Sequence, residues 1–114
     1  MKTKILVPTL AFAVLILAIV VPNLVSIYLR RNDTASNACV SNLRMIQAAK
    51  EQWALETHKT ANDMVTMEDI QPYMGRGSAG ELPICPSGGI YTPQRVGQPP
   101  TCSIGGQGHS LRAP

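Results

Sequence analysis

Residues 5–29 form an uncharged, largely apolar run of 25 residues, and this run constrains the chain more than any other feature. As a helix it would reach roughly 37 Å, at about 1.5 Å of rise per residue, whereas the hydrocarbon core of a bilayer is about 30 Å thick. Two lysines precede the run and two arginines follow it. The sequence therefore predicts a single membrane-spanning helix within residues 1–31, with its amino terminus in the cytoplasm.

A cleaved signal peptide is the competing interpretation of this run. The run is longer than the apolar region of a usual signal peptide, and no cleavage site of small residues follows it directly. We therefore expect the segment to be retained as an anchor. Pro22 lies inside it, and because a proline removes a backbone hydrogen bond from a helix, we expect a kink at Pro22.

The helical pattern continues beyond the apolar run into residues 32–57. Spacings of four, three, three and four residues place one set of side chains on a single face, and we expect this face to pack the stem helix on the head: Cys39, Leu43, Ile46, Ala49 and Trp53. Most charged side chains, Lys50 among them, are expected on the solvated surface. No strong helix breaker occurs between Leu29 and Cys39, so one helix of about 50 residues is predicted to span the membrane and continue into the head.

The remaining chain, residues 32–114, has room for one small soluble domain. Thr66 followed by acidic residues predicts a short helix over residues 66–74. Short runs at 82–85, 90–92 and 101–104, separated by turn residues, predict a small β-sheet within residues 82–104. The expected fold class is therefore α+β, with a long kinked N-terminal helix packed on a small antiparallel β head.

Composition and motifs argue against several functions. The net charge is only +3, and the cations are scattered without interleaved aromatic residues, so we expect no binding to nucleic acid. No serine–histidine–acid set, pair of catalytic carboxylates or glycine-rich phosphate loop is recognisable. We therefore predict no catalytic residue, no cofactor and no small-molecule substrate, and we expect that the protein is not an enzyme.

Three cysteines are present, at positions 39, 85 and 102. A disulfide between Cys85 and Cys102 would close a loop of 18 residues and stabilise a small head by about 3 kcal/mol. We predict this pairing. A bond from Cys39 to either of the other two is the alternative and would tie the stem to the sheet, whereas an unpaired Cys39 would be a small buried thiol. The odd number leaves at least one cysteine without a partner in the same chain.

The sequence contains two sets of potential metal ligands. The three cysteines and His109 offer zinc ligands, but the spacing from Cys102 to His109 matches no usual zinc motif and no Cys-x-x-Cys pair occurs. Asp63, Glu68 and Asp69 do not have the spacing of an EF-hand calcium loop, and acids at a helix start explain the last two. The sequence therefore predicts no metal site.

Several motifs together resemble bacterial type IV pilins and type II secretion pseudopilins. They are the run Ala38-Cys39-Val40-Ser41-Asn42-Leu43-Arg44-Met45-Ile46 in the stem, and Cys85-Pro86-Ser87-Gly88-Gly89-Ile90-Tyr91, Cys102-Ser103 and Gly108-His109 in the head. The chain departs from this family at its N-terminus. The residues Met1-Lys2-Thr3-Lys4 before the apolar run do not include the glycine that ends the family's leader, and Ile5 stands where the family has a glutamate.

The resemblance implies a structural subunit of a pilus or pseudopilus-type filament or secretion assembly. Its partners would be membrane lipid and copies of itself or related subunits, contacted through the N-terminal helix. Its location would be the bacterial inner membrane, with the head in the periplasm or carried into a filament. The alternative function is a single-pass, membrane-anchored periplasmic interaction module that does not polymerise.

Overall fold

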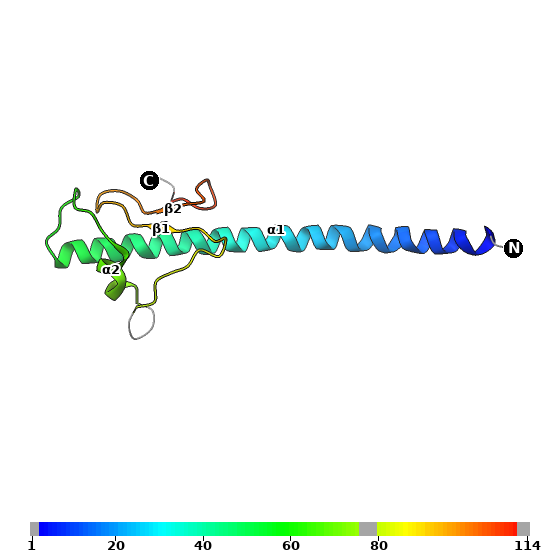
Figure 1. The fold of residues 1–114 in the computed structure, drawn as a ribbon, viewed down its shortest axis with the longest axis horizontal. Coiled ribbons are helices and arrows are strands. Elements are labelled where there is room, and N and C mark those ends of the chain that lie inside the picture. Colours follow the sequence, from blue (N-terminus) through cyan, green and yellow to red (C-terminus); the bar gives the residue numbers. More distant parts are fainter. Residues whose placement is uncertain (1–2, 76–79, 112–114) are drawn as a thin grey trace. The chain divides into compact units, whose positions relative to one another are not determined.

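The computed structural model describes residues 3–75 and 80–111. Helix α1 runs from Thr3 to Glu56 and is 54 residues long, which confirms the prediction of one long N-terminal helix (Figure 1). The chain divides into two compact units, residues 1–32 and residues 33–114, so α1 contributes to both. The outer ends of the two predicted domains, at residues 1 and 114, lie outside the described residues.

The first unit is an exposed apolar helix. Side chains such as those of Phe12 and Leu24 are 67% and 60% exposed, and α1 is long and apolar enough to cross a membrane. Pro22 lies inside the helix, where Ser26 Oγ donates a hydrogen bond to its carbonyl oxygen at 2.8 Å. The helix is continuous through Pro22, and the kink expected there stays a prediction.

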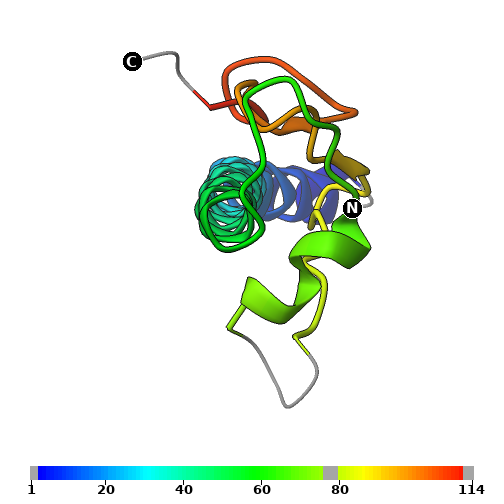
Figure 2. The same ribbon diagram turned by 90° about the vertical axis from the view of Figure 1, so that its left-hand side faces the viewer.

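The second unit is built around the last turns of α1. Two short helical elements follow that helix, α2 over Met67–Ile70 and the 3₁₀ helix η1 over Gln71–Tyr73. Two strands complete the unit, β1 over Tyr91–Thr92 and β2 over Thr101–Cys102. Figure 2 shows α2 and the β1–β2 segment on different sides of α1. The observed class is therefore α+β, with one long helix and a small antiparallel sheet.

The sheet is smaller than predicted. Strands β1 and β2 pair antiparallel with Tyr91 opposite Cys102, and Ser103 N donates to Ile90 O at 2.9 Å beyond the pair. The strand expected at 82–85 does not form. Pro83 has no amide hydrogen to donate, and the Ile84 carbonyl instead accepts a hydrogen bond from Asn42 Nδ2 at 3.1 Å. This segment is therefore held by a side chain of α1 and not by a strand ladder.

The core of the second unit contains all five residues of the predicted stem face. Cys39, Leu43 and Ile46 are fully buried, and Ala49 and Trp53 are nearly so. The other members of the core come from the rest of the head: Ala54, Val65, Ile70, Met74, Cys85, Tyr91 and Cys102. One face of α1 thus supplies a large part of the interior, as amphipathic spacing requires.

Lys50 differs from the expectation of a solvated side chain, because it is fully buried. Its ammonium group donates to the carbonyl oxygens of Pro93 at 2.7 Å and Arg95 at 2.8 Å, and also to that of Gln98. Burial lowers the pKa of Lys50 to about 8. Lys50 lies four residues after Ile46 on the helix and therefore shares its buried face, although the lysine side chain is charged.

Candidate metal centre

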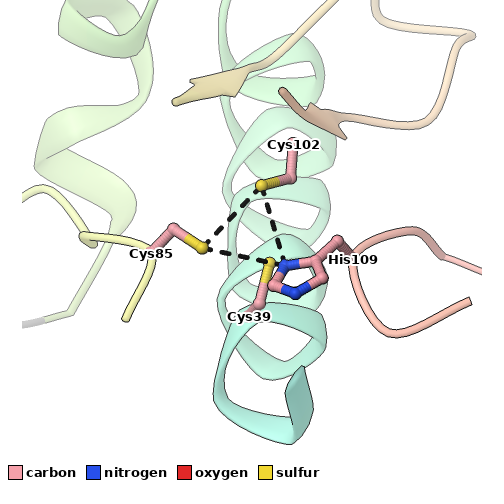
Figure 3. Close-up of side chains that lie close together, drawn as sticks. All are labelled: Cys39, Cys85, Cys102 and His109. Carbon is pink, nitrogen blue, oxygen red and sulfur yellow. Dashed lines mark hydrogen bonds between the residues drawn. The ribbon is translucent and has the colours of Figure 1, made fainter. Parts of the chain in front are cut away.

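Four potential metal ligands converge in the head (Figure 3). Cys39 comes from α1, Cys85 from the loop before β1, Cys102 from β2 and His109 from the loop that follows β2. Their ligand atoms all lie within 4.8 Å of one another. Segments separated by up to 70 positions in the sequence therefore meet at one point.

The distances within this cluster are not those of a disulfide. The sulfurs of Cys85 and Cys102 are 3.8 Å apart, whereas a disulfide bond is about 2.05 Å long. All three cysteines are free and buried. The predicted Cys85–Cys102 disulfide is therefore not formed, and neither is the alternative bond to Cys39. The fold instead brings all three cysteines to one place.

The imidazole of His109 faces the same sulfurs. Its Nδ1 atom is 3.8 Å from Cys85 Sγ and 4.0 Å from Cys102 Sγ (Figure 3). Tetrahedral zinc with Zn–S of about 2.3 Å and Zn–N of about 2.0 Å would separate two sulfurs by about 3.8 Å and a sulfur from a nitrogen by about 3.5 Å. The separation of the Cys85 and Cys102 sulfurs therefore equals the tetrahedral value, the histidine is a few tenths of an ångström too far out, and the Cys39 sulfur lies within 4.8 Å of the other three atoms.

Two glycines make the close approach of these segments feasible. A Cβ atom on Gly89 would collide with Cys102 Sγ and would come within 3.2 Å of the Ile104 side chain. A Cβ on Gly108 would lie 2.6 Å from the Ser36 hydroxyl oxygen of α1. Both contacts are too short for a side chain. Gly89 thus lets the turn after Cys85 lie against Cys102, and Gly108 lets the His109 loop lie against α1.

Hydrogen-bond donors surround two of the sulfurs. Burial raises the pKa of the Cys85 thiol, but the backbone amides of Ser87 and Gly89 donate to its sulfur, and the net effect lowers this pKa to about 6. Burial raises the pKa of Cys39 to about 12, although the Tyr91 hydroxyl donates to its sulfur and opposes this shift. The protein's own donors thus favour a thiolate at Cys85, whereas Cys39 stays protonated without a nearby cation.

The Tyr91 hydroxyl is itself held in place. Asn42 Nδ2 donates to Tyr91 Oη at 3.1 Å and also to the Ile84 carbonyl. Burial raises the pKa of Tyr91, so this phenol remains a donor at neutral pH. A chain of hydrogen bonds therefore leads from Asn42 through Tyr91 to the sulfur of Cys39.

Two of the acids considered from the sequence, Asp63 and Asp69, lie in local contacts. Asp63 accepts hydrogen bonds from the Thr60 amide at 2.6 Å and from the Thr60 hydroxyl at 3.0 Å. Asp69 forms a capping box with Thr66 at the start of α2. His58 lies just after α1 with φ of 55°. These contacts give Asp63 a role in a turn and Asp69 a role in a helix cap, and neither role needs an ion.

Sequence reasoning named the four clustered residues but set the metal interpretation aside on spacing. Zinc motifs are recognised by two ligand pairs close in sequence, and here no two ligands are closer than seven positions. The signal available in the sequence was the turn-forming run Pro86-Ser87-Gly88-Gly89 after Cys85. In the structure this run forms a turn in which Gly88 has φ of 82° and two amides donate to the Cys85 sulfur. Comparison of the chain with protein-family models, curated proteins and solved structures finds no match.

Proposed function

We propose that this chain is a membrane-anchored structural subunit of a pilus or pseudopilus-type assembly. The observation that carries the proposal is the double character of α1. Over residues 8–29 the helix exposes large apolar side chains, such as Leu17 at 59% and Ile27 at 63%, while its second half supplies a large part of the core of the head. An apolar surface of this extent requires a cover, because surface patches on soluble monomers are far smaller.

Lipid and a bundle of identical helices are equally suitable covers. Both surroundings are apolar, so transfer of the helix from bilayer to a filament core involves little change in hydrophobic free energy. The pilin-like motifs of the stem and head favour a subunit that makes this transfer. The head also exposes large apolar side chains, Ile84 at 82% and Ile90 at 73%, which offer contacts to neighbouring subunits.

The second candidate is a membrane-anchored module that presents its head to a partner and never polymerises. The sequence feature that favours it is Ile5, which stands where pilins have the glutamate that sets the register between subunits. Both candidates require insertion of α1 into the membrane, and they differ in whether copies of the chain associate through it.

A matched pair of substitutions on α1 tests insertion. Leu17→Lys places a charge near the middle of the apolar segment and should cost about 3 kcal/mol of insertion free energy. Leu55→Lys is the control, because Leu55 is on the same helix but is 77% exposed on the head. We expect the full chain and Leu55→Lys to stay in membranes after alkaline extraction, and Leu17→Lys to be released more readily. Equal release of both variants would contradict the proposal.

Filament formation is tested separately. Surface material sheared from cells that express the chain is examined by electron microscopy with antibodies against the head. Labelled filaments support a polymerising subunit. Membrane retention without any labelled filament would overturn that part of the proposal and favour the anchored module.

A further inference from the structure

We propose that Cys39, Cys85, Cys102 and His109 bind one zinc ion in a closed tetrahedral Cys₃His site that fastens the head to α1. The inference concerns residues 33–114 and does not depend on whether the chain spans a membrane or polymerises. It replaces the covalent link expected from the sequence with a coordinate link that joins four segments.

The geometry gives the first argument. Three sulfurs and one nitrogen lie within 4.8 Å of one another, and the separation of 3.8 Å between the Cys85 and Cys102 sulfurs equals that expected across a tetrahedral zinc ion. The ligand atom of the imidazole is Nδ1, since this is the nitrogen nearest to the sulfurs of Cys85 and Cys102. The histidine needs to move inward by only a few tenths of an ångström to reach a metal–nitrogen distance of about 2.0 Å.

The outer contacts give the second argument. Metal-bound thiolates in proteins accept hydrogen bonds from surrounding donors, and these donors orient the ligands. Here the amides of Ser87 and Gly89 donate to Cys85, and the Tyr91 hydroxyl, held by Asn42, donates to Cys39. The donors are built into the backbone turn and the core, so they hold these two sulfurs in position.

The choice of metal follows from the ligands. Three thiolates and an imidazole in a tetrahedral array suit zinc, whereas magnesium and calcium prefer oxygen. The three cysteines are at most 6% exposed, so four protein atoms complete the coordination sphere and leave no position for water or substrate. A closed site of this kind is structural, in contrast to a catalytic zinc site with its open position.

The architecture of the head gives the third argument. Its strands are two residues each, and most of the described chain after α1 is loop. Such a small domain has few backbone ladders to hold it and usually needs a disulfide or a metal. The four ligands come from α1, the loop before β1, β2 and the loop after β2, so one ion would join the segments that the short sheet leaves loosely connected.

Binding of zinc exchanges protons for the metal. Each cysteine binds as a thiolate, so a cysteine that is still protonated releases its proton as its sulfur becomes a ligand, and the neutral imidazole contributes Nδ1 while its Nε2 retains the hydrogen. The bound unit then carries a net charge of −1 from three thiolates and Zn²⁺. The hydrogen-bond donors around Cys85 and Cys39 would stabilise this negative charge on the sulfurs.

The test uses the full chain purified in detergent under reducing conditions and loaded with one equivalent of Zn²⁺, followed by removal of loose metal. We expect about one zinc per chain by elemental analysis. Replacement of zinc by Co²⁺ should give the visible absorption of tetrahedral cobalt together with a sulfur-to-cobalt charge-transfer band. Zinc content near background in the loaded chain, or a stoichiometric metal other than zinc in protein as purified, would overturn the proposal.

Three variants of the histidines locate the site. His109→Gln removes one ligand, and because His109 is only partly buried this change spares the apolar core. After the same zinc loading and removal of loose metal, we expect the zinc content of His109→Gln to fall to background. His109→Cys should restore zinc binding with a fourth sulfur. His58→Gln is the matched control outside the cluster and should bind zinc like the unchanged chain. Equal zinc content in all three variants would contradict the site.

The competing disulfide has its own readout. Peptide mapping of the zinc-loaded chain without reduction should recover all three cysteines as separate peptides. Recovery of Cys85 linked to Cys102 in that material would overturn the metal site. Neither result bears on membrane insertion or on filaments, so failure of this proposal and failure of the proposed function remain distinguishable.

Discussion

Single residues of α1 decide how the loops of the head are held. The Lys50 ammonium group reaches three backbone carbonyls between Pro93 and Gln98. Burying a charged amine is costly unless hydrogen bonds compensate for the lost water, and here all three of its hydrogens have acceptors. Lys50 thus supplies these three carbonyls with the hydrogen-bond donors that a neighbouring strand would otherwise provide.

Substitution of Lys50 measures this role. Lys50→Met keeps the length of the side chain but leaves three carbonyls without their donor, so we expect the free energy of unfolding to fall by about 2–4 kcal/mol. Lys59→Met is the control, because Lys59 is exposed and its Nζ lies 5.6 Å from the centre of the Trp53 ring, a contact of about 0.5–1 kcal/mol. Chemical denaturation of the full chain in detergent compares the two. Equal losses would contradict a special role for Lys50.

Tyr91 acts at the same scale through the sulfur of Cys39. Tyr91→Phe removes the hydroxyl that donates to this sulfur and leaves the ring in the core. Outer-shell changes of this kind typically weaken metal affinity by about 10–100-fold, and we expect a loss in this range for Zn²⁺. Competition with a coloured chelator measures it. Tyr73→Phe is the control, because the Tyr73 hydroxyl donates to Glu56 at 2.7 Å, a contact that involves no residue of the cluster. Unchanged zinc affinity in Tyr91→Phe would argue against the hydrogen bond.

At the scale of elements, the chain after α1 depends on caps and turns more than on regular structure. Helix α2 has only four residues and begins with a capping box in which Asp69 N donates to Thr66 Oγ1 at 3.2 Å and Thr66 N donates to Asp69 Oδ2 at 2.9 Å. A helix this short cannot form by propensity alone. Its cap and the burial of Ile70 therefore hold it.

Removal of the cap tests this argument. Thr66→Ala deletes the side-chain oxygen and should lower the free energy of unfolding by about 1 kcal/mol. Glu68→Ala, in the same turn, takes no part in the box and should cost less, about 0.3–0.5 kcal/mol through the helix dipole. Denaturation curves of the two variants give the comparison. A larger loss in Glu68→Ala would contradict the capping argument.

At the scale of the whole molecule, two kinds of stabilisation divide along the chain. Residues 3–32 form a helix whose backbone hydrogen bonds are internal, and its apolar surface requires a nonpolar environment. Residues 33–114 have a thin core and short strands, and the four-ligand cluster joins them. The two parts should therefore respond differently to the loss of metal.

Hydrogen exchange of the full chain in detergent tests this division. Addition of a strong chelator should speed amide exchange in residues 80–111, because zinc links those segments to α1, while residues 3–32 keep their protection. The His109→Gln variant should already show the faster exchange without chelator. Exchange that rises equally in both parts, or that does not change at all, would contradict a metal that stabilises only the head.

The long helix and its buried face were predictable because they depend on local order. An uncharged run of 25 residues fixes the apolar segment, and 3.6-residue periodicity places Cys39 to Trp53 on one face without knowledge of their contacts. The start of α2 was predictable for the same reason, since a cap and its acid are three residues apart. The burial of Lys50 was missed because its charge was given more weight than its position on the face.

The chain's own sequence thus determined the exposed apolar helix, its amphipathic continuation and the position of its end. Only the tertiary structure decided that 82–85 is not a strand, that Lys50 is buried, and that three cysteines and a histidine meet. Each of these features depends on contacts of α1 with segments 42 to 70 positions away in the sequence, and local patterns of polarity and spacing carry no information about contacts at such separations. The fold supplies that information by wrapping the loops of the head around one face of α1.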